Sequence, residues 1–142
     1  MSFILIVGAG RVGSSVARAM LAAGHEVSVL DEDPLSHERL DVELGRSWEE
    51  AGGRFTIGTA LELDALEEAG IVDADVFIAS TNGDNTNLVV SQIAHRRFEV
   101  PRVIARVLDP RRAAWYQEQG LKTICPTQIA IEQLEQAALA DG

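Results

Sequence analysis

The glycine-rich segment Gly8-Ala9-Gly10-Arg11-Val12-Gly13 is the part of the sequence best suited to bind a ligand. It directly follows the apolar run 3–7, which has the composition of a β-strand, and it opens a stretch with apolar residues at helical spacing. Gly8 allows a tight turn, Gly10 lets a diphosphate approach the backbone, and Gly13 lets the helix pack against the sheet. Free N–H groups at the helix start would then bind the phosphates. The alternative is a glycine-rich turn without a ligand.

Asp31 follows Gly13 by 18 residues and ends a second predicted strand. At this place a carboxylate can accept hydrogen bonds from both ribose hydroxyls and repels a 2′-phosphate. The two features together predict an adenosine-based ligand and exclude NADP. The alternative role for Asp31 is an N-cap for a helix near Pro34. Glu32 is a further candidate contact. We expect it to be a solvated charge rather than a metal ligand.

Further candidate contacts follow from the fold class predicted below, in which several loops face one crevice. Arg11 could reach a terminal phosphate through a bidentate contact, or it could be a solvated arginine at the helix start. Asp84 is another candidate contact, but for Asp84 and its neighbour Asn85 helix capping is the favoured role. Arg106 would point into the crevice only if the alternation of side chains along its strand places it on that face. The remaining candidates lie in the segments after the first, third and fourth predicted strands: Val12, Gly58, Thr59, Ala60, Ser80, Thr81 and Asn82.

Short β-rich runs alternate with helical patterns along the whole chain. The expected strands are 3–7, 27–30, 55–57, 76–80, 103–108 and 123–125. Gly24, Gly70 and Gly120 stand where helices should end, and Asp109-Pro110 and Thr127 where helices should begin. Strands that are apolar on both faces are typical of a parallel sheet covered by helices on both sides. We therefore predict an α/β fold: a three-layer, doubly wound, Rossmann-like parallel sheet of about six strands, forming a single domain over 1–142.

Two segments depart from this simple alternation. A helix after Pro34 should end near Leu44-Gly45, and the residues from 46 to 53 have the composition of a polar connector with a possible helical turn. The last helix, about 127–140, has a wide apolar stripe, so we expect it to dock on its own sheet or on a partner subunit.

Composition excludes several classes of function. The 22 acidic residues outnumber the 12 basic ones and give a formal net charge of −10, which disfavours nucleic acid and anionic membranes as partners. The sequence contains neither a run of about 18 apolar residues nor a signal peptide, so we expect a cytoplasmic protein without direct membrane insertion. A single cysteine, Cys125, fits a reducing compartment.

In combination these motifs resemble a known family, the N-terminal nucleotide-binding domain of Trk-type potassium-uptake regulators, also called the TrkA-N, RCK or KTN domain. The resemblance runs from about Phe3 to Pro126. Its motifs are Gly8–Gly13, Gly24–Val27 leading to Asp31, Leu66–Ile71, Ala74–Ala79, Thr81–Asn87, and Val103–Val107 with Asp109-Pro110.

The resemblance implies a regulatory domain that binds ATP, ADP or NAD(H) and controls potassium transport through a membrane channel or transporter partner. It also implies homodimers or larger rings, with a C-terminal crossover helix that reaches the partner subunit, and a possible peripheral location at the inner face of the cell membrane. Because the chain ends soon after that helix, we expect a fragment, a truncated paralogue or one subunit of a larger assembly.

One segment differs from the family pattern. Family members usually have Gly-Asp-Ala-Thr after the third strand, whereas this chain has Gly58-Thr59-Ala60-Leu61 and so lacks a carboxylate and a capping threonine there. A scaffold that has lost nucleotide affinity is therefore one alternative function.

The other alternative is a small NAD-dependent oxidoreductase or epimerase-like enzyme. The only tyrosine, Tyr116, and the only lysine, Lys122, are six residues apart, which misses the spacing of a helix-borne catalytic pair. The three histidines are scattered along the chain. We therefore expect no catalytic residues and no metal site.

Overall fold

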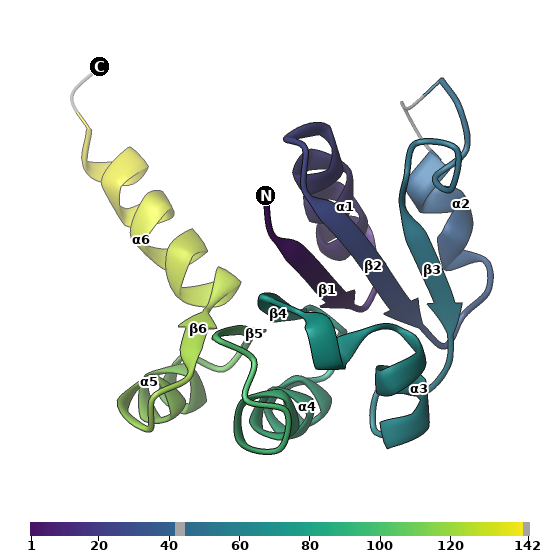
Figure 1. Cartoon of the computed structure of the whole chain (residues 1–142). Coiled ribbons are helices and arrows are strands. Elements are labelled where there is room, and N and C mark those ends of the chain that lie inside the picture. The colour runs from purple at the N-terminus through teal and green to yellow at the C-terminus, as the bar shows by residue number, and fades with distance from the viewer. Residues whose placement is uncertain (42–44, 141–142) are drawn as a thin grey trace.

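The computed structural model describes residues 1–41 and 45–140. Its centre is one six-stranded parallel sheet with the strand order β3-β2-β1-β4-β5-β6 (Figure 1). This order confirms the predicted doubly wound α/β class, since the chain winds outward from β1 first to one edge and then to the other. The strands are β1 (Phe3–Val7), β2 (Glu26–Asp31), β3 (Arg54–Ile57), β4 (Val76–Ala79), β5 (Arg102–Arg106) and β6 (Lys122–Ile124).

Helices connect the strands and cover both faces of the sheet. Gly24, Gly70 and Gly120 each follow the end of a helix, as the sequence predicts. Asp109 caps α5, accepting a hydrogen bond from the backbone of Arg111 at 2.9 Å. The helices are α1 (Arg11–Ala22), α2 (Ser36–Asp41), α3 (Leu63–Glu68), the 3-10 turn η1 (Ile71–Asp73), α4 (Asp84–Arg96), α5 (Pro110–Glu118) and α6 (Pro126–Leu139).

Two large apolar clusters lie on opposite faces of the sheet. Side chains that alternate along β1 point to different clusters, because neighbouring residues of a strand face opposite sides. Leu5 packs with Leu66 of α3 and Val90 of α4, whereas Ile6 packs with Ala17 of α1 and Leu40 of α2. Figure 1 accordingly shows α1 and α2 on one side of the sheet and α3, α4 and α5 on the other. This arrangement accounts for strands that are apolar on both faces.

The segment between α2 and β3 differs from the predicted polar connector, because it contributes a large side chain to the core. Trp48 is fully buried, and its indole Nε1 donates to the backbone oxygen of Arg54 at 2.9 Å. A Cβ atom on Gly53 would lie 2.1 Å from the indole ring, so glycine makes room for it. The predicted helix end at Leu44 lies outside the described residues.

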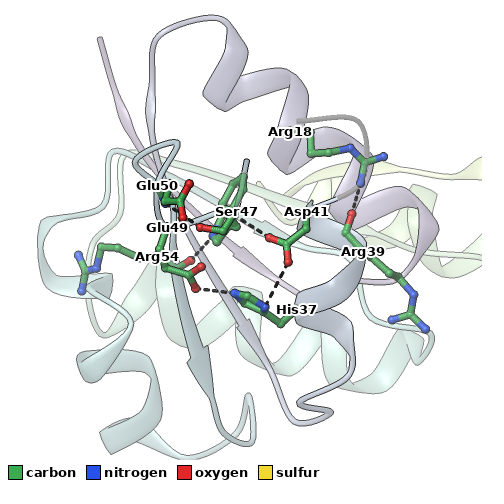
Figure 2. Close-up of polar contacts among 9 residues, drawn as sticks. Arg18, His37, Arg39, Asp41, Ser47, Glu49, Glu50 and Arg54 are labelled. Atoms are coloured by element: carbon green, nitrogen blue, oxygen red, sulfur yellow. Dashed lines mark hydrogen bonds and ion pairs between the residues drawn. The ribbon is translucent and has the colours of Figure 1, made fainter. Parts of the chain in front are cut away.

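Polar contacts fasten this segment to α2. The backbone N–H of Trp48 donates to Oδ1 of Asp41 at 2.7 Å. Figure 2 shows His37 of α2 between Asp41 and Glu49, with Nε2 at 2.5 Å from Glu49 Oε1 and Nδ1 at 3.8 Å from Asp41 Oδ2. His37 therefore joins α2 to the turn that carries Trp48.

The last helix, α6, lies apart from the rest of the fold. Figure 1 shows it extending away from the sheet beyond β6, and none of its residues is buried. It begins at Pro126 after an N-cap at Cys125, one residue earlier than the expected start at Thr127. Large apolar side chains remain exposed on it, among them Ile131 at 41% and Leu134 at 70%. None of the described helices combines the length and hydropathy that crossing a membrane requires.

The buried indole generates a stability prediction. We expect Trp48→Ala to lower the free energy of unfolding by about 3–5 kcal/mol, because it leaves a cavity beside α2 and removes the hydrogen bond to Arg54. Urea denaturation followed by far-UV circular dichroism measures this. Trp115→Ala is the matched control: Trp115 is 54% exposed, and its loss should cost about 1 kcal/mol or less. Equal losses in the two variants would contradict the structural role of Trp48.

Candidate nucleotide-binding site

The turn after β1 brings α1 unusually close to the sheet. Gly8 has a φ of +99°, and a Cβ atom there would lie 2.8 Å from the backbone of Ser80 and Thr81. A Cβ atom on Gly13 would lie 1.8 Å from the carbonyl oxygen of Gly8. Both positions therefore require glycine, for conformational and steric reasons. These two contacts account for the first and third glycines of the motif.

Gly10, the second glycine of the motif, differs from the other two. It is the N-cap of α1, has no side-chain capping bond, and a Cβ atom there would meet nothing within 4 Å. The space in front of it is open, and the first N–H groups of α1 have no partner within the helix. Such a helix start is suited to bind an anionic group.

Asp31 at the end of β2 is hydrogen-bonded to the glycine turn. Its Oδ2 accepts from the backbone N–H of Ala9 at 2.7 Å, and its Oδ1 accepts from the N–H of Asp33 at 2.8 Å. The alternative role as an N-cap does not hold, because α2 begins only at Ser36. The carboxylate is half-buried, which leaves it open to the crevice while its position is fixed.

The loop after β4 forms the opposite wall. The buried hydroxyl of Ser80 donates to the carbonyl oxygens of Gly8 and Val7, at 3.0 and 3.2 Å. Thr81 is held by Asn87 of α4: its N–H and its hydroxyl donate to Asn87 Oδ1, at 2.9 and 2.6 Å. The two walls of the crevice are therefore connected through backbone groups.

These walls enclose a cavity of about 440 Å³ at the carboxyl end of the strands. In doubly wound sheets ligands bind at this end, where the chain changes direction along the sheet. Most of the predicted residues line the cavity: Gly8, Gly10, Asp31, Glu32, Gly58, Thr59, Ala60, Ser80, Thr81 and Asn82.

Five predicted residues do not line the cavity. Arg11 and Val12 are exposed on the first turn of α1, and Gly13 is buried behind the glycine turn. The Nη1 of Arg106 donates to the carbonyl oxygen of Thr81 at 3.3 Å, so this arginine supports the wall instead of lining it.

Asp84, the fifth, neither lines the cavity nor caps α4. Its carboxylate accepts hydrogen bonds from the N–H groups of Leu108 and Asp109, at 2.7 and 3.1 Å, while Gly83 occupies the N-cap position. Its neighbour Asn85 accepts from Arg112 Nη2 at 2.6 Å. The favoured capping role was therefore wrong for both residues, and Asp84 instead ties α4 to the loop after β5.

Sequence analysis missed several lining residues. The most informative are Ser36 and Arg39 of α2, which line the same cavity as Asp31. They follow Asp31 by five and eight residues, and the only available signal was their i,i+3 spacing on a helix. Leu61, at the position where the family has a capping threonine, also lines the cavity, and α3 has no side-chain cap.

One group of described side chains consists of residue types that can bind metal ions. Ligand atoms of His37, Asp41 and Glu49 lie within 4.8 Å of one another. However, the two ring nitrogens of His37 face different carboxylates, as Figure 2 shows. Each carboxylate therefore contacts its own ring nitrogen of His37.

Comparison with known proteins gives consistent matches. Residues 4–127 match the TrkA-N domain family. The chain is 41% identical over 139 residues to the Trk system potassium uptake protein TrkA of Streptomyces coelicolor, covering 98% of this chain and 59% of that protein. It therefore spans less than two thirds of the length of this relative.

Solved structures agree with the fold. The Kef CTD of Shewanella denitrificans, in an AMP-bound form, is 26% identical with a TM-score of 0.77, over 96% of this chain and 79% of that one. The GsuK channel bound to NAD is 20% identical with a TM-score of 0.76, over 96% of this chain and 23% of that one.

Proposed function

Because the chain belongs to the TrkA-N domain family, we propose that it is a regulatory nucleotide-binding domain that controls potassium transport through a membrane channel or transporter partner. The observation that carries this proposal is the hydrogen bond from the N–H of Ala9 to Asp31, which joins the glycine turn to the carboxylate at the end of β2, beside one cavity. Under this proposal the site binds its ligand and breaks no bond.

We propose NAD(H) or ATP/ADP as the ligand. The first N–H groups of α1 would bind the phosphates, and Asp31 would accept hydrogen bonds from the adenine ribose. Gly58, Thr59 and Ala60, which line the same cavity, would contact the adenine. Two structural relatives support this choice, since one was solved with NAD bound and the other with AMP bound. The carboxylate of Asp31 should make a 2′-phosphorylated nucleotide the weaker ligand.

The absence of a catalytic step is itself part of the proposal. Tyr116, the only tyrosine, lies in α5, packed against two apolar clusters, and Lys122 lies on the edge strand β6. Neither lines the cavity. A hydride-transfer enzyme of this fold would need an acid or base beside the nicotinamide, so a sensor function fits these positions better.

The output of such a sensor would be a change in the geometry of an assembly. A ligand shifts a conformational equilibrium only when it binds one state more tightly than the other. We propose that the chain forms homodimers or larger rings in which α6 packs on the partner subunit. The domain would then lie in the cytoplasm, at the inner face of the membrane through its transport partner.

Nucleotide binding can be measured as thermal stabilisation. We expect NAD, NADH, ATP or ADP to raise the melting temperature, since free ligand at about 100 times its Kd stabilises the folded state by about 2.7 kcal/mol. Gly10→Val should abolish the shift while the protein still folds, because a side chain there projects into open space. Asp31→Ala should abolish it as well.

Glu67→Ala is the matched control for Asp31→Ala. Glu67 is exposed on α3 outside the cavity, so its variant loses the same charge and should keep the shift. Stabilisation that survives both Gly10→Val and Asp31→Ala would contradict the site. An absorbance change at the nicotinamide band, when substrates are added with NAD(H), would favour the enzyme alternative.

Assembly through α6 generates a separate prediction. We expect sedimentation velocity to show a dimer or larger species, and Leu134→Glu to dissociate it, because a charge would replace an apolar side chain at the interface. Gln136→Glu adds the same charge about 200° around the helix and should leave the assembly unchanged. A monomeric wild-type protein, or equal behaviour of the two variants, would contradict the interface.

A further inference from the structure

The wall of the cavity formed by α2 carries an unexpected positive charge. Among the described residues, Arg39 is the only cationic side chain that lines the cavity. The carboxylates of Asp31, Glu32 and Asp33 line it as well. The ribose end of the site therefore contains both the anionic group expected from the sequence and a cation that the sequence did not indicate.

The guanidinium group of Arg39 is held in place by two hydrogen bonds. Its Nη1 donates to Oγ of Ser36 at 3.0 Å and to the carbonyl oxygen of Ala9 at 3.2 Å. Ser36 is 2% exposed and also lines the cavity. Since both contacts use Nη1, Nη2 and Nε can donate to a ligand.

Asp31 and Arg39 contact the same residue of the glycine turn. The N–H of Ala9 donates to Asp31, and its carbonyl oxygen accepts from Arg39. The carboxylate and the guanidinium group therefore both lie against Ala9, beside the place where we propose that the ribose hydroxyls bind. A carboxylate there disfavours a 2′-phosphate, whereas an arginine binds it through paired hydrogen bonds.

We propose that Arg39, supported by Ser36, is a specificity-determining residue that contacts a phosphate group on the ribose 2′ position and partly offsets the repulsion from Asp31. This inference rests on the proposed function, because it concerns the same site. Glu32 and Asp33 add negative charge, and like Arg39 they are exposed, so water and salt screen all three charges. The domain should therefore prefer unphosphorylated ribose by a modest factor and still bind 2′-phosphorylated nucleotides.

Two ligand pairs that differ only in the 2′-phosphate test this proposal. They are AMP with adenosine 2′,5′-bisphosphate, and NAD with NADP, each titrated calorimetrically into wild type and Arg39→Gln. Losing a hydrogen bond between charged groups costs about 1.5 kcal/mol or more, which corresponds to about tenfold in affinity. We expect this tenfold loss for the 2′-phosphorylated member of each pair, beyond any change for its partner.

Two further variants complete the experiment. Arg39→Lys keeps the charge without the paired donors and should give an intermediate loss, and it also answers the question if Arg39→Gln does not fold. Arg102→Gln removes the same charge at the exposed start of β5, outside the cavity, and should leave the ratio of affinities unchanged.

The outcomes separate the two proposals. If Arg39→Gln weakens both members of a pair equally, or if wild type binds AMP and NAD but neither 2′-phosphorylated ligand, the role of Arg39 is overturned while the nucleotide site stands. If wild type binds none of the four ligands and none of the nucleotides proposed above, the proposed function is wrong, and the inference about Arg39 is wrong as well.

Discussion

The close approach between the start of α1 and the turn after β1 is the constraint on which the rest of the site depends. Because a Cβ atom on Gly13 would lie 1.8 Å from the carbonyl oxygen of Gly8, the helix can lie against the turn only when both residues are glycine. The same carbonyl oxygen accepts a hydrogen bond from the buried hydroxyl of Ser80. This junction aims the free N–H groups of α1 at the cavity and fixes the distance between its two walls.

Hydrogen bonds from side chains then hold the walls of the cavity in place before a ligand binds. Asp31 holds the N–H of Ala9, Arg39 holds its carbonyl oxygen, and Asn87 holds the loop at Thr81. A ligand that enters such a site has little backbone to order, so less of its interaction energy is lost on binding. The last helix is organised differently: α6 has no buried residue in the described chain. Under the proposed function, this contrast fits a domain whose response is expressed between subunits.

The sequence predicted those parts of the site that depend on local backbone geometry. The roles of Gly8 and Gly13, the place of Asp31 and the doubly wound parallel sheet follow from motif spacing and from the rules of parallel sheets. Trp48 and Arg39 could not be found in this way. Trp48 lies in a segment of polar composition, and its burial depends on α2 and β3 together. Arg39 reaches the cavity only because α2 packs beside the glycine turn, and a helical arginine is usually solvated.

The measurement that tests the central claim most directly is amide chemical-shift mapping of the ¹⁵N-labelled protein during titration with NAD and, separately, ADP. If the glycine turn and the loop after β4 form one nucleotide site, the amides of 9–13 and of 81–83 should shift together along one saturation curve, with Asp31 among the responding residues. Shifts confined to other surfaces, or no shift at saturating concentrations of either nucleotide, would contradict the claim that this cavity is the nucleotide-binding site.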